Sequence, residues 1–324
     1  MKKKIILFFI VLAILGCEEA EDVGEQPELY QNGEVLTLFE NDPKGINVIF
    51  LGDGFIEKDL TKGGSYEKSG RSIIEHLFTV PPFSTHQEYF NAYIVFAESK
   101  DEFIRQKSFP RQTAFGIEIS LATDRLTIQD PDACFRYAHK AVNYDSQRDI
   151  IIVLANDYRE MGIAAYGIAV TCRRMKEKMA VHEVGHTFAN LADEYISPSR
   201  AEYYIGSRNL DELVSRSPNV DLKPDLEQIK WSHFIGENGY ETVGAHEGGL
   251  YLSEGVWRPE ETSIMLSHTE SYFNAPSREA IVKKIFKVKG IPYSFEEFKR
   301  IDVIPTTTNA RLSRLDSTKE LQCW

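Results

Sequence analysis

The 324-residue chain is poor in cysteine and has no excess of basic charge. Its four cysteines are too few for a mini-protein held together by disulfides. It has 37 Lys and Arg against 49 Asp and Glu, and a formal net charge of -12 argues against a surface that binds nucleic acid or anionic membrane throughout. The composition, 42% hydrophobic and 27% charged, is that of a folded globular chain with room for one large domain or two modest ones.

The N-terminus has the charge and hydrophobicity pattern of an export signal. Lys2 to Lys4 precede an apolar run, residues 5–15, which is too short for a comfortable transmembrane helix, and Gly16-Cys17 follow. Residues 14–17 resemble a bacterial lipobox, in which the cysteine is acylated. We therefore predict a lipoprotein signal peptide over residues 1–16 and a lipid anchor at Cys17, with simple secretion or an uncleaved anchor as alternatives.

A polar stretch follows, and we predict an acidic tether or linker over residues 17–44. Its run Glu18 to Asp22 resembles the acidic export signal of surface lipoproteins in Bacteroides-type bacteria. This resemblance implies an exported lipoprotein at the outer membrane or cell surface, with a periplasm-facing position as the alternative. Once Cys17 is lipidated, the remaining Cys134, Cys172 and Cys323 form either one disulfide, Cys134 to Cys172, or three free thiols.

From residue 45 onwards, short apolar runs alternate with helical patterns, which is typical of an α/β domain. The predicted strands are residues 46–51, 89–96, 149–154 and 168–172. The predicted helices are residues 66–78, 176–190 and 275–287. The loop-rich residues 197–245 show no second hydrophobic core or repeat, so we predict a single domain over residues 45–305 and a polar C-terminal tail over residues 306–324.

The clearest chemical motif is an HExxH sequence, His182 to His186, within the predicted helix 176–190. Histidines four positions apart lie about 40° apart around a helix, so both imidazoles can reach one Zn²⁺, with Glu183 beside the open coordination position. Zinc lowers the pKa of water toward 7, and Glu183 can accept the proton as the water attacks a peptide carbonyl. The motif predicts a zinc site with His182 and His186 as ligands and Glu183 as the catalytic base. A pair of purely structural histidines is the alternative.

Zinc needs a third protein ligand, and Asp193 is the favoured candidate. On a continuous helix it would lie roughly 13 Å beyond the metal along the axis. The helix must therefore end first, and Asn190, which can adopt the left-handed conformation, lies where that end is needed. Glu194 is the alternative ligand, and the residue that does not bind is expected to orient a histidine or hold the turn. Tyr195 is a weaker candidate for oxyanion stabilisation, with packing as its alternative role.

Residues 182–195 read HEVGHTFANLADEY and resemble the signature of the IgA-peptidase family of zinc metallopeptidases. Further segments agree with this resemblance in the same order: residues 48–55, 229–231, 247–259 and 273–280. It implies a metzincin-like zinc peptidase domain, with a twisted mixed sheet, an active-site helix, a C-terminal helical subdomain and a methionine-containing turn beneath the metal. Residues 263–265, which end in Met265, match that turn. The usual third-ligand position of metzincins holds Ala192 here, one residue before Asp193.

The leading functional prediction is a zinc-dependent metalloendopeptidase that hydrolyses extracellular or periplasmic proteins. The alternatives are a catalytically idle binding module at the cell surface and a zinc amidase that acts on cell-wall peptide. The expected partner is a protein or peptide substrate, with no nucleic acid and with membrane contact only through Cys17. Strand 167–172 is predicted to be a sheet edge that pairs with an extended peptide. Further candidates for the substrate cleft are Arg173, Arg174, Arg258, His233, His246 and His268.

Overall fold

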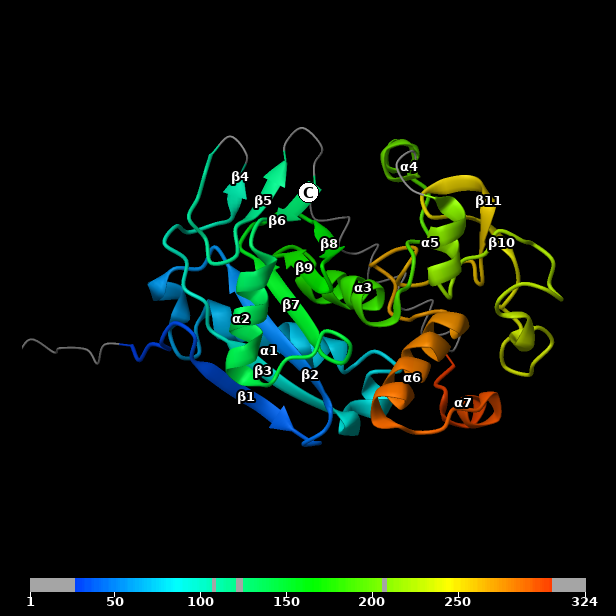
Figure 1. The fold of residues 1–324 in the computed structure, drawn as a ribbon, viewed down its shortest axis with the longest axis horizontal. Coiled ribbons are helices and arrows are strands. Elements are labelled where there is room, and N and C mark those ends of the chain that lie inside the picture. Colours follow the sequence, from blue (N-terminus) through cyan, green and yellow to red (C-terminus); the bar gives the residue numbers. More distant parts are fainter. Residues whose placement is uncertain (1–26, 107–108, 121–124, 206–208, 305–324) are drawn as a thin grey trace, which may run out of the picture.

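A six-stranded mixed sheet forms one lobe of the molecule (Figure 1). The computed structural model describes residues 27–106, 109–120, 125–205 and 209–304. In order across the sheet, the strands are β1 (Val35–Glu40), β3 (Phe90–Val95), β2 (Ile46–Asp53), β7 (Ile150–Ala155), β9 (Ile168–Cys172) and β8 (Gly162–Ala165). The four inner strands are parallel, and the two edge strands are antiparallel to their neighbours. The predicted α/β class with a twisted mixed sheet is confirmed.

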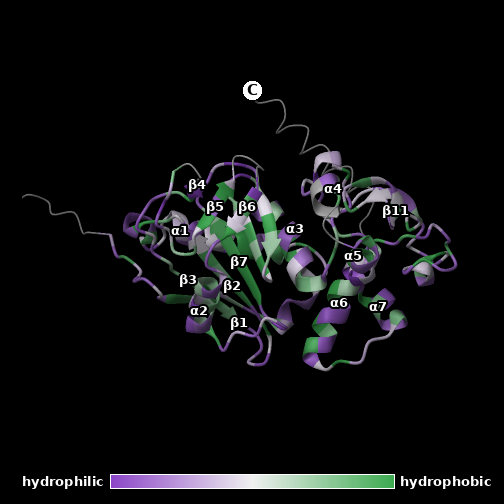
Figure 2. Ribbon diagram, turned by 45° about the horizontal axis from the view of Figure 1, so that its top comes forward, coloured by the Kyte–Doolittle hydropathy of each residue, from purple (hydrophilic) through white to green (hydrophobic). Residues whose placement is uncertain are grey.

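Both faces of this sheet are covered, and β2 and β7 are therefore buried along their whole length. Val48 and Phe50 of β2 pack with α1 (Ser65–Leu77) and α3 (Lys176–Ala189). The alternate residues Ile49 and Leu51 belong to the opposite cluster. That cluster includes residues of α2 (Pro131–Ala141) and of the small sheet β4 (Arg105–Gln106), β5 (Ile117–Ser120) and β6 (Arg125–Ile128). Figure 2 shows the central strands as the most hydrophobic part of this lobe.

The second lobe contains the C-terminal helices and a hairpin (Figure 1). Its elements are α4 (Pro198–Ile205), α5 (Leu210–Arg216), β10 (His246–Gly249), β11 (Leu252–Arg258), α6 (Ala275–Lys289) and α7 (Phe295–Ile301). The 3₁₀ helices of the molecule are η1 (Glu57–Leu60), η2 (Ser84–Tyr89) and η3 (Ser232–Phe234). A buried ion pair between Arg278 and Asp302 joins α6 to the residue after α7. No helix in the described ranges combines the length and the apolar character needed to span a membrane.

The sheet begins before residue 45, so the predicted linker over residues 17–44 is wrong for its described part. Strand β1 pairs with β3, and the ring of Tyr30 stacks on Phe96 with centroids 3.8 Å apart. The strand escaped prediction because it is only half-buried, and its sequence lacks a clear hydrophobic period. The predicted signal peptide, the anchor at Cys17 and the tail from residue 306 lie outside the described residues.

The predicted substrate edge at residues 167–172 is also wrong. Strand β9 pairs with β7 on one side and with β8 on the other, so β8 is the edge on this side of the sheet. The hairpin turn at Tyr166 and Gly167 folds β8 back onto β9. Of the two alternatives for the core cysteines, the structure has free thiols, because Cys134 and Cys172 are both buried and unbridged.

Asp53, the last residue of β2, carries a buried carboxylate that holds a neighbouring loop. It accepts hydrogen bonds from the Thr113 hydroxyl and from the backbone N–H groups of Phe115 and Ile117, at 2.8 to 2.9 Å. Burial raises the pKa of Asp53 to about 6, and these hydrogen bonds offset only part of the rise. The folded protein therefore holds a proton on Asp53 more tightly than the unfolded chain does.

This raised pKa predicts a pH-dependent contribution to stability. Protonation of Asp53 favours folding below about pH 4, and we expect that contribution to be lost as the pH rises through about 6, by up to roughly 3 kcal/mol. Urea denaturation of the wild type and Asp53→Asn between pH 4 and pH 7 measures it. The free energy of unfolding of the wild type should fall relative to that of the variant across this window. A difference that stays constant with pH would contradict the prediction.

Candidate metal centre

Helix α3 directs two imidazoles to one point. The rings of His182 and His186 have centroids 4.8 Å apart. His182 Nδ1 lies 2.8 Å from the carbonyl oxygen of Ile264, and His186 Nδ1 lies 2.6 Å from that of Leu191. Because a carbonyl oxygen only accepts, each Nδ1 is the protonated nitrogen of the neutral ring. In the neutral ring, which is the form that binds a metal ion, Nε2 then carries the lone pair.

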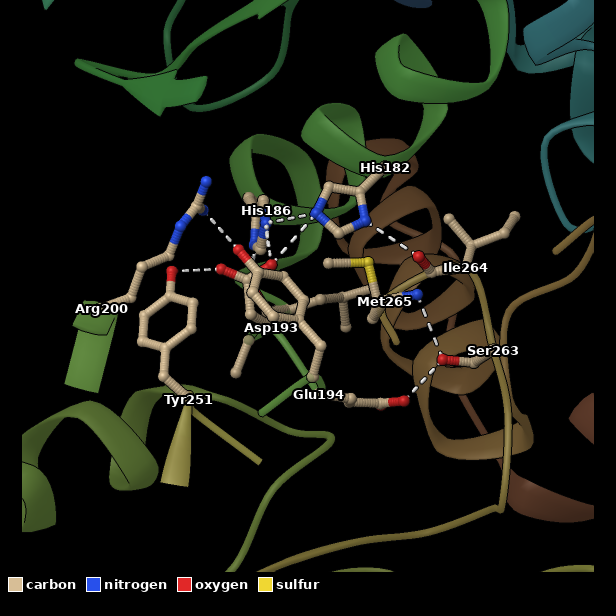
Figure 3. Close-up of polar contacts among 12 residues, drawn as sticks. His182, His186, Asp193, Glu194, Arg200, Tyr251, Ser263, Ile264 and Met265 are labelled. Atoms are coloured by element: carbon tan, nitrogen blue, oxygen red, sulfur yellow. Dashed lines mark hydrogen bonds and ion pairs between the residues drawn. The ribbon is translucent and has the colours of Figure 1, made fainter. Parts of the chain in front are cut away.

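The chain turns back directly after this helix. Asn190 adopts the left-handed conformation (φ 55°), and its N–H reaches the carbonyl oxygens of Gly185 and His186, so α3 ends at Ala189 as predicted. The turn brings Asp193 Oδ1 to 3.1 Å from His182 Nε2 and to 3.2 Å from His186 Nε2 (Figure 3). The two Nε2 atoms are themselves 3.1 Å apart.

Three donor atoms at these distances fit a single metal ion. Ligand atoms of a tetrahedral zinc site with bonds of 2.0–2.1 Å lie about 3.3 Å apart, close to the 3.1 to 3.2 Å here. Burial is the largest single effect on the pKa of His186 and lowers it, but the charge and hydrogen bond of Asp193, together with Glu183 and the Leu191 carbonyl, raise it to about 9. Burial is also the largest single effect on Asp193 and would raise its pKa, yet the charges and hydrogen bonds of His186 and His182 together hold it far below its ordinary value. Each charge thus stabilises the other, and the carboxylate of Asp193 brings negative charge to the point where a metal cation would bind.

Glu183 lies on the same helix, next to the edge strand. Its side chain is buried, and a Cβ atom added to Gly162 of β8 would lie 2.4 Å from Glu183 Oε1. The absence of a side chain at Gly162 therefore allows the carboxylate to reach this edge. Burial raises the pKa of Glu183, while His182 and His186 lower it. A raised pKa favours the proton-transfer role that the HExxH motif predicts for this residue.

Glu194, the alternative third ligand, points away from the histidines (Figure 3). Its carboxylate is buried and accepts hydrogen bonds from Asn219, Ser263 and Asn274. Burial raises the pKa of Glu194 to about 7, against the lowering effect of these bonds. Its backbone N–H donates to the carbonyl oxygen of Met265 at 2.9 Å. The structure thus brings Asp193 to the histidines and leaves Glu194 to hold the turn.

The loop of residues 263–265 supports the centre from the second lobe. Met265 is fully buried, and its Sδ atom would lie 2.9 Å from a Cβ added to Gly185 in α3. Ile264 supplies the carbonyl oxygen that orients His182. Ala192, at the position where metzincins usually have their third ligand, packs instead in a small apolar cluster with Val220 and Val256.

Two residues that the sequence did not single out surround Asp193. The hydroxyl of Tyr251 donates a hydrogen bond to Asp193 Oδ2. The other carboxylate oxygen, Oδ1, is the one that lies close to both histidines. Arg200 Nη1 donates to the hydroxyl of Tyr195, and the rings of Tyr195 and Tyr251 pack edge to face with centroids 5.2 Å apart. Tyr251 lies 58 positions from Asp193, and no local pattern connects them.

Most of the other predicted cleft residues have partners of their own. Arg258 donates to the carbonyl oxygens of Glu247 and Gly248, and Arg173 donates to Asn156 Oδ1. The remaining pairs are Arg174 with Glu160, His268 with Glu160 and His233 with Glu279. None of these contacts involves the three residues of the cluster.

Comparison with protein families gives a match to the family described as IgA Peptidase M64, over residues 39–241 and 237–285. The two matched segments together cover well over half of the 324 residues. The first includes His182, Glu183, His186 and Asp193, and the second includes Tyr251 and the Met265 loop.

Proposed function

The chain belongs to the IgA Peptidase M64 family, and on that basis we propose that it is a zinc-dependent metalloendopeptidase that cleaves extracellular or periplasmic proteins. The observation that carries the proposal is the cluster of His182, His186 and Asp193, whose donor atoms lie within 3.2 Å of one another. His, His and carboxylate is a donor set that zinc uses in catalytic sites, where the fourth position stays open. A metzincin-like fold is part of this proposal, and the buried Met265 beneath the histidines supports it.

In the proposed mechanism each residue has a separate task. His182, His186 and Asp193 would hold the zinc, which, when bound, supplies a Lewis acid that polarises a carbonyl oxygen and lowers the pKa of water. Glu183 accepts the proton of the attacking water and then delivers it to the leaving amine. The carbonyl oxygens of Ile264 and Leu191 keep both Nε2 atoms turned toward the site.

The edge strand β8 is the proposed docking position for the substrate backbone. Among the strands of the described residues it is hydrogen-bonded only to β9, and its Gly162 lies against Glu183. An extended peptide that adds to this edge would pass beside the catalytic carboxylate. The functional role predicted for strand 167–172 therefore moves to the strand next to it.

Metal removal tests the proposal. Purified protein should contain one zinc per chain and should cleave members of a mixed peptide library. A chelator such as 1,10-phenanthroline should abolish cleavage, and added zinc should restore it. Absence of zinc from carefully prepared protein would refute the ligand assignment. Bound zinc without any cleavage would favour the idle binding module, and cleavage of cell-wall fragments alone would favour the amidase.

Tyr251 is expected to position Asp193 for metal binding. Tyr251→Phe removes the hydroxyl that donates to Asp193 Oδ2, and losses of this kind typically weaken metal affinity about 10- to 100-fold. Competition with a fluorescent zinc chelator measures the change. Tyr240→Phe is a matched control, because this phenol bonds Asp302 in the second lobe. Equal zinc affinity in the wild type and Tyr251→Phe would exclude the positioning role.

We also propose that the mature protein is anchored by lipid at Cys17, at the outer membrane or cell surface. The support is the sequence alone: the lysines, the apolar run and Gly16-Cys17 that precede an acidic stretch. Metabolic labelling with a fatty acid should mark the wild type and not Cys17→Ser. Label retained in the variant would refute this anchor position.

A further inference from the structure

Arg200 brings a positive charge to the rim of the metal centre. It lies in α4, and its exposed side chain extends toward the side of the site where Asp193 and Tyr251 lie (Figure 3). The guanidinium donates to the hydroxyl of Tyr195, and the guanidinium carbon Cζ lies 5.6 Å from the centroid of the Tyr195 ring. Tyr195 packs against Tyr251, which bonds Asp193. Two aromatic side chains thus hold the guanidinium in place beside the catalytic residues.

The polar partners of this guanidinium are neutral. They are the phenols of Tyr195 and Tyr251. The negative charge of Asp193 also acts on Arg200 and raises its pKa, but within the described part of the chain no carboxylate forms an ion pair with this guanidinium. Exposed arginines elsewhere do have acidic partners, such as Arg216 with Glu212 and Arg300 with Glu297. This difference is notable in a chain where acidic residues outnumber basic ones by 49 to 37. A guanidinium has five N–H donors, more than these phenols use.

The net charge of the site would also favour binding of an anion. A divalent metal ion would balance the two carboxylates of Glu183 and Asp193. The charge of Arg200 would then be uncompensated within the site. A planar guanidinium held on aromatic rings is suited to bind a carboxylate through two parallel hydrogen bonds.

We propose that Arg200 is a specificity-determining residue that binds a carboxylate of the peptide substrate. The carboxylate is either an acidic side chain near the scissile bond or the free C-terminus of a short peptide, because both present the same group. This inference rests on the proposed peptidase function, and it adds a substrate class to it: acidic peptides are preferred over their neutral counterparts.

Matched peptides test this preference with the full chain. The substrates are quenched fluorescent peptides that differ only by Glu or Gln at positions flanking the scissile bond. Each peptide is made with a free and with an amidated C-terminus. Cleavage is compared for the wild type, Arg200→Ala and Arg200→Lys. Charge-assisted hydrogen bonds typically contribute enough for a 10- to 100-fold change, so kcat/KM for the acidic peptide should fall by about that factor in Arg200→Ala, mainly through KM. The neutral peptide should change by less than about threefold, and Arg200→Lys should be intermediate. Arg136→Ala, an exposed arginine of α2 on the opposite face of the sheet, is the control.

The outcomes distinguish the two sources of the carboxylate, an acidic side chain and a free C-terminus. They also distinguish failure of the Arg200 proposal from failure of the peptidase proposal. Loss of preference within the Glu and Gln pair alone assigns the acidic side chain, and loss within the free and amidated pair alone assigns the C-terminus. Equal losses for acidic and neutral peptides, or no loss at all, would overturn the role of Arg200. Peptide binding by Glu183→Gln, measured by calorimetry, gives a readout without catalysis. A preference for acidic peptides that depends on Arg200 in that background would support carboxylate binding even if the wild type cleaved nothing, in which case only the peptidase proposal fails.

Discussion

Replacement of Glu183 by glutamine is expected to lower kcat for peptide cleavage by about 10²- to 10⁴-fold while the metal stays bound. The amide cannot accept the proton of the attacking water, and the residue is not one of the three whose donor atoms converge. The variant keeps the size of the side chain that packs against Gly162, so the fold should be unchanged. Steady-state kinetics and metal analysis on the same preparation measure both effects.

Glu177→Gln provides a control on the same helix. Glu177 lies in the first turn of α3 and bonds Ser72 and Lys176, at a distance of six positions along the chain from Glu183. Its replacement should leave kcat close to that of the wild type. Retention of full activity in Glu183→Gln would remove this residue from the mechanism, and loss of zinc in that variant would show a structural role instead.

Asp193→Asn is expected to weaken zinc binding by on the order of 100-fold or more, because it removes the charged member of the ligand set. Activity should fall with it at limiting zinc. A second readout is thermal stability: zinc should raise the melting temperature of the wild type strongly and that of Asp193→Asn weakly, since only a ligand bound to the folded state stabilises it.

Glu194→Gln is the matched comparison, one position along the chain. It should keep the zinc affinity and lose stability, by about 1–3 kcal/mol, because a neutral amide replaces the carboxylate that accepts hydrogen bonds from Asn219, Ser263 and Asn274. The reverse pattern, with zinc lost in Glu194→Gln and retained in Asp193→Asn, would assign the third ligand to Glu194 and refute the present assignment.

The local parts of this site were predictable from the sequence because short-range geometry determines them. The spacing of His182 and His186 on one helix, and a left-handed Asn190 that lets Asp193 return, both follow from helix geometry. The supports were not predictable in this way. Glu194 meets Asn219, Ser263 and Asn274 at sequence separations of 25, 69 and 80 positions. Only the packing of the two lobes brings such residues together.

The strands of the sheet also differ in how well the sequence predicts them, with buried inner strands predicted better than half-exposed edge strands. The inner strand β2 is buried on both faces, so its unbroken apolar sequence identifies it. The edge strands β1 and β8 are half-exposed and carry weaker patterns, so the sequence indicates a linker in place of β1 and gives no strand signal at β8. The substrate edge was misplaced by one strand for this reason. Edges are defined by which neighbour is missing, and a single sequence does not contain that information.

The hydrogen bond from His182 to Ile264 has a consequence for the order in which the enzyme matures. A nascent chain that has emerged as far as Asp193 already carries all three donor side chains. It still lacks the carbonyl group that orients His182 and the phenol of Tyr251 that bonds Asp193, which follow about 60 to 70 positions later. Under the proposed zinc assignment, tight metal capture is therefore a property of the completed fold, and synthesis of the second lobe is the step that converts an inert motif into a metal centre.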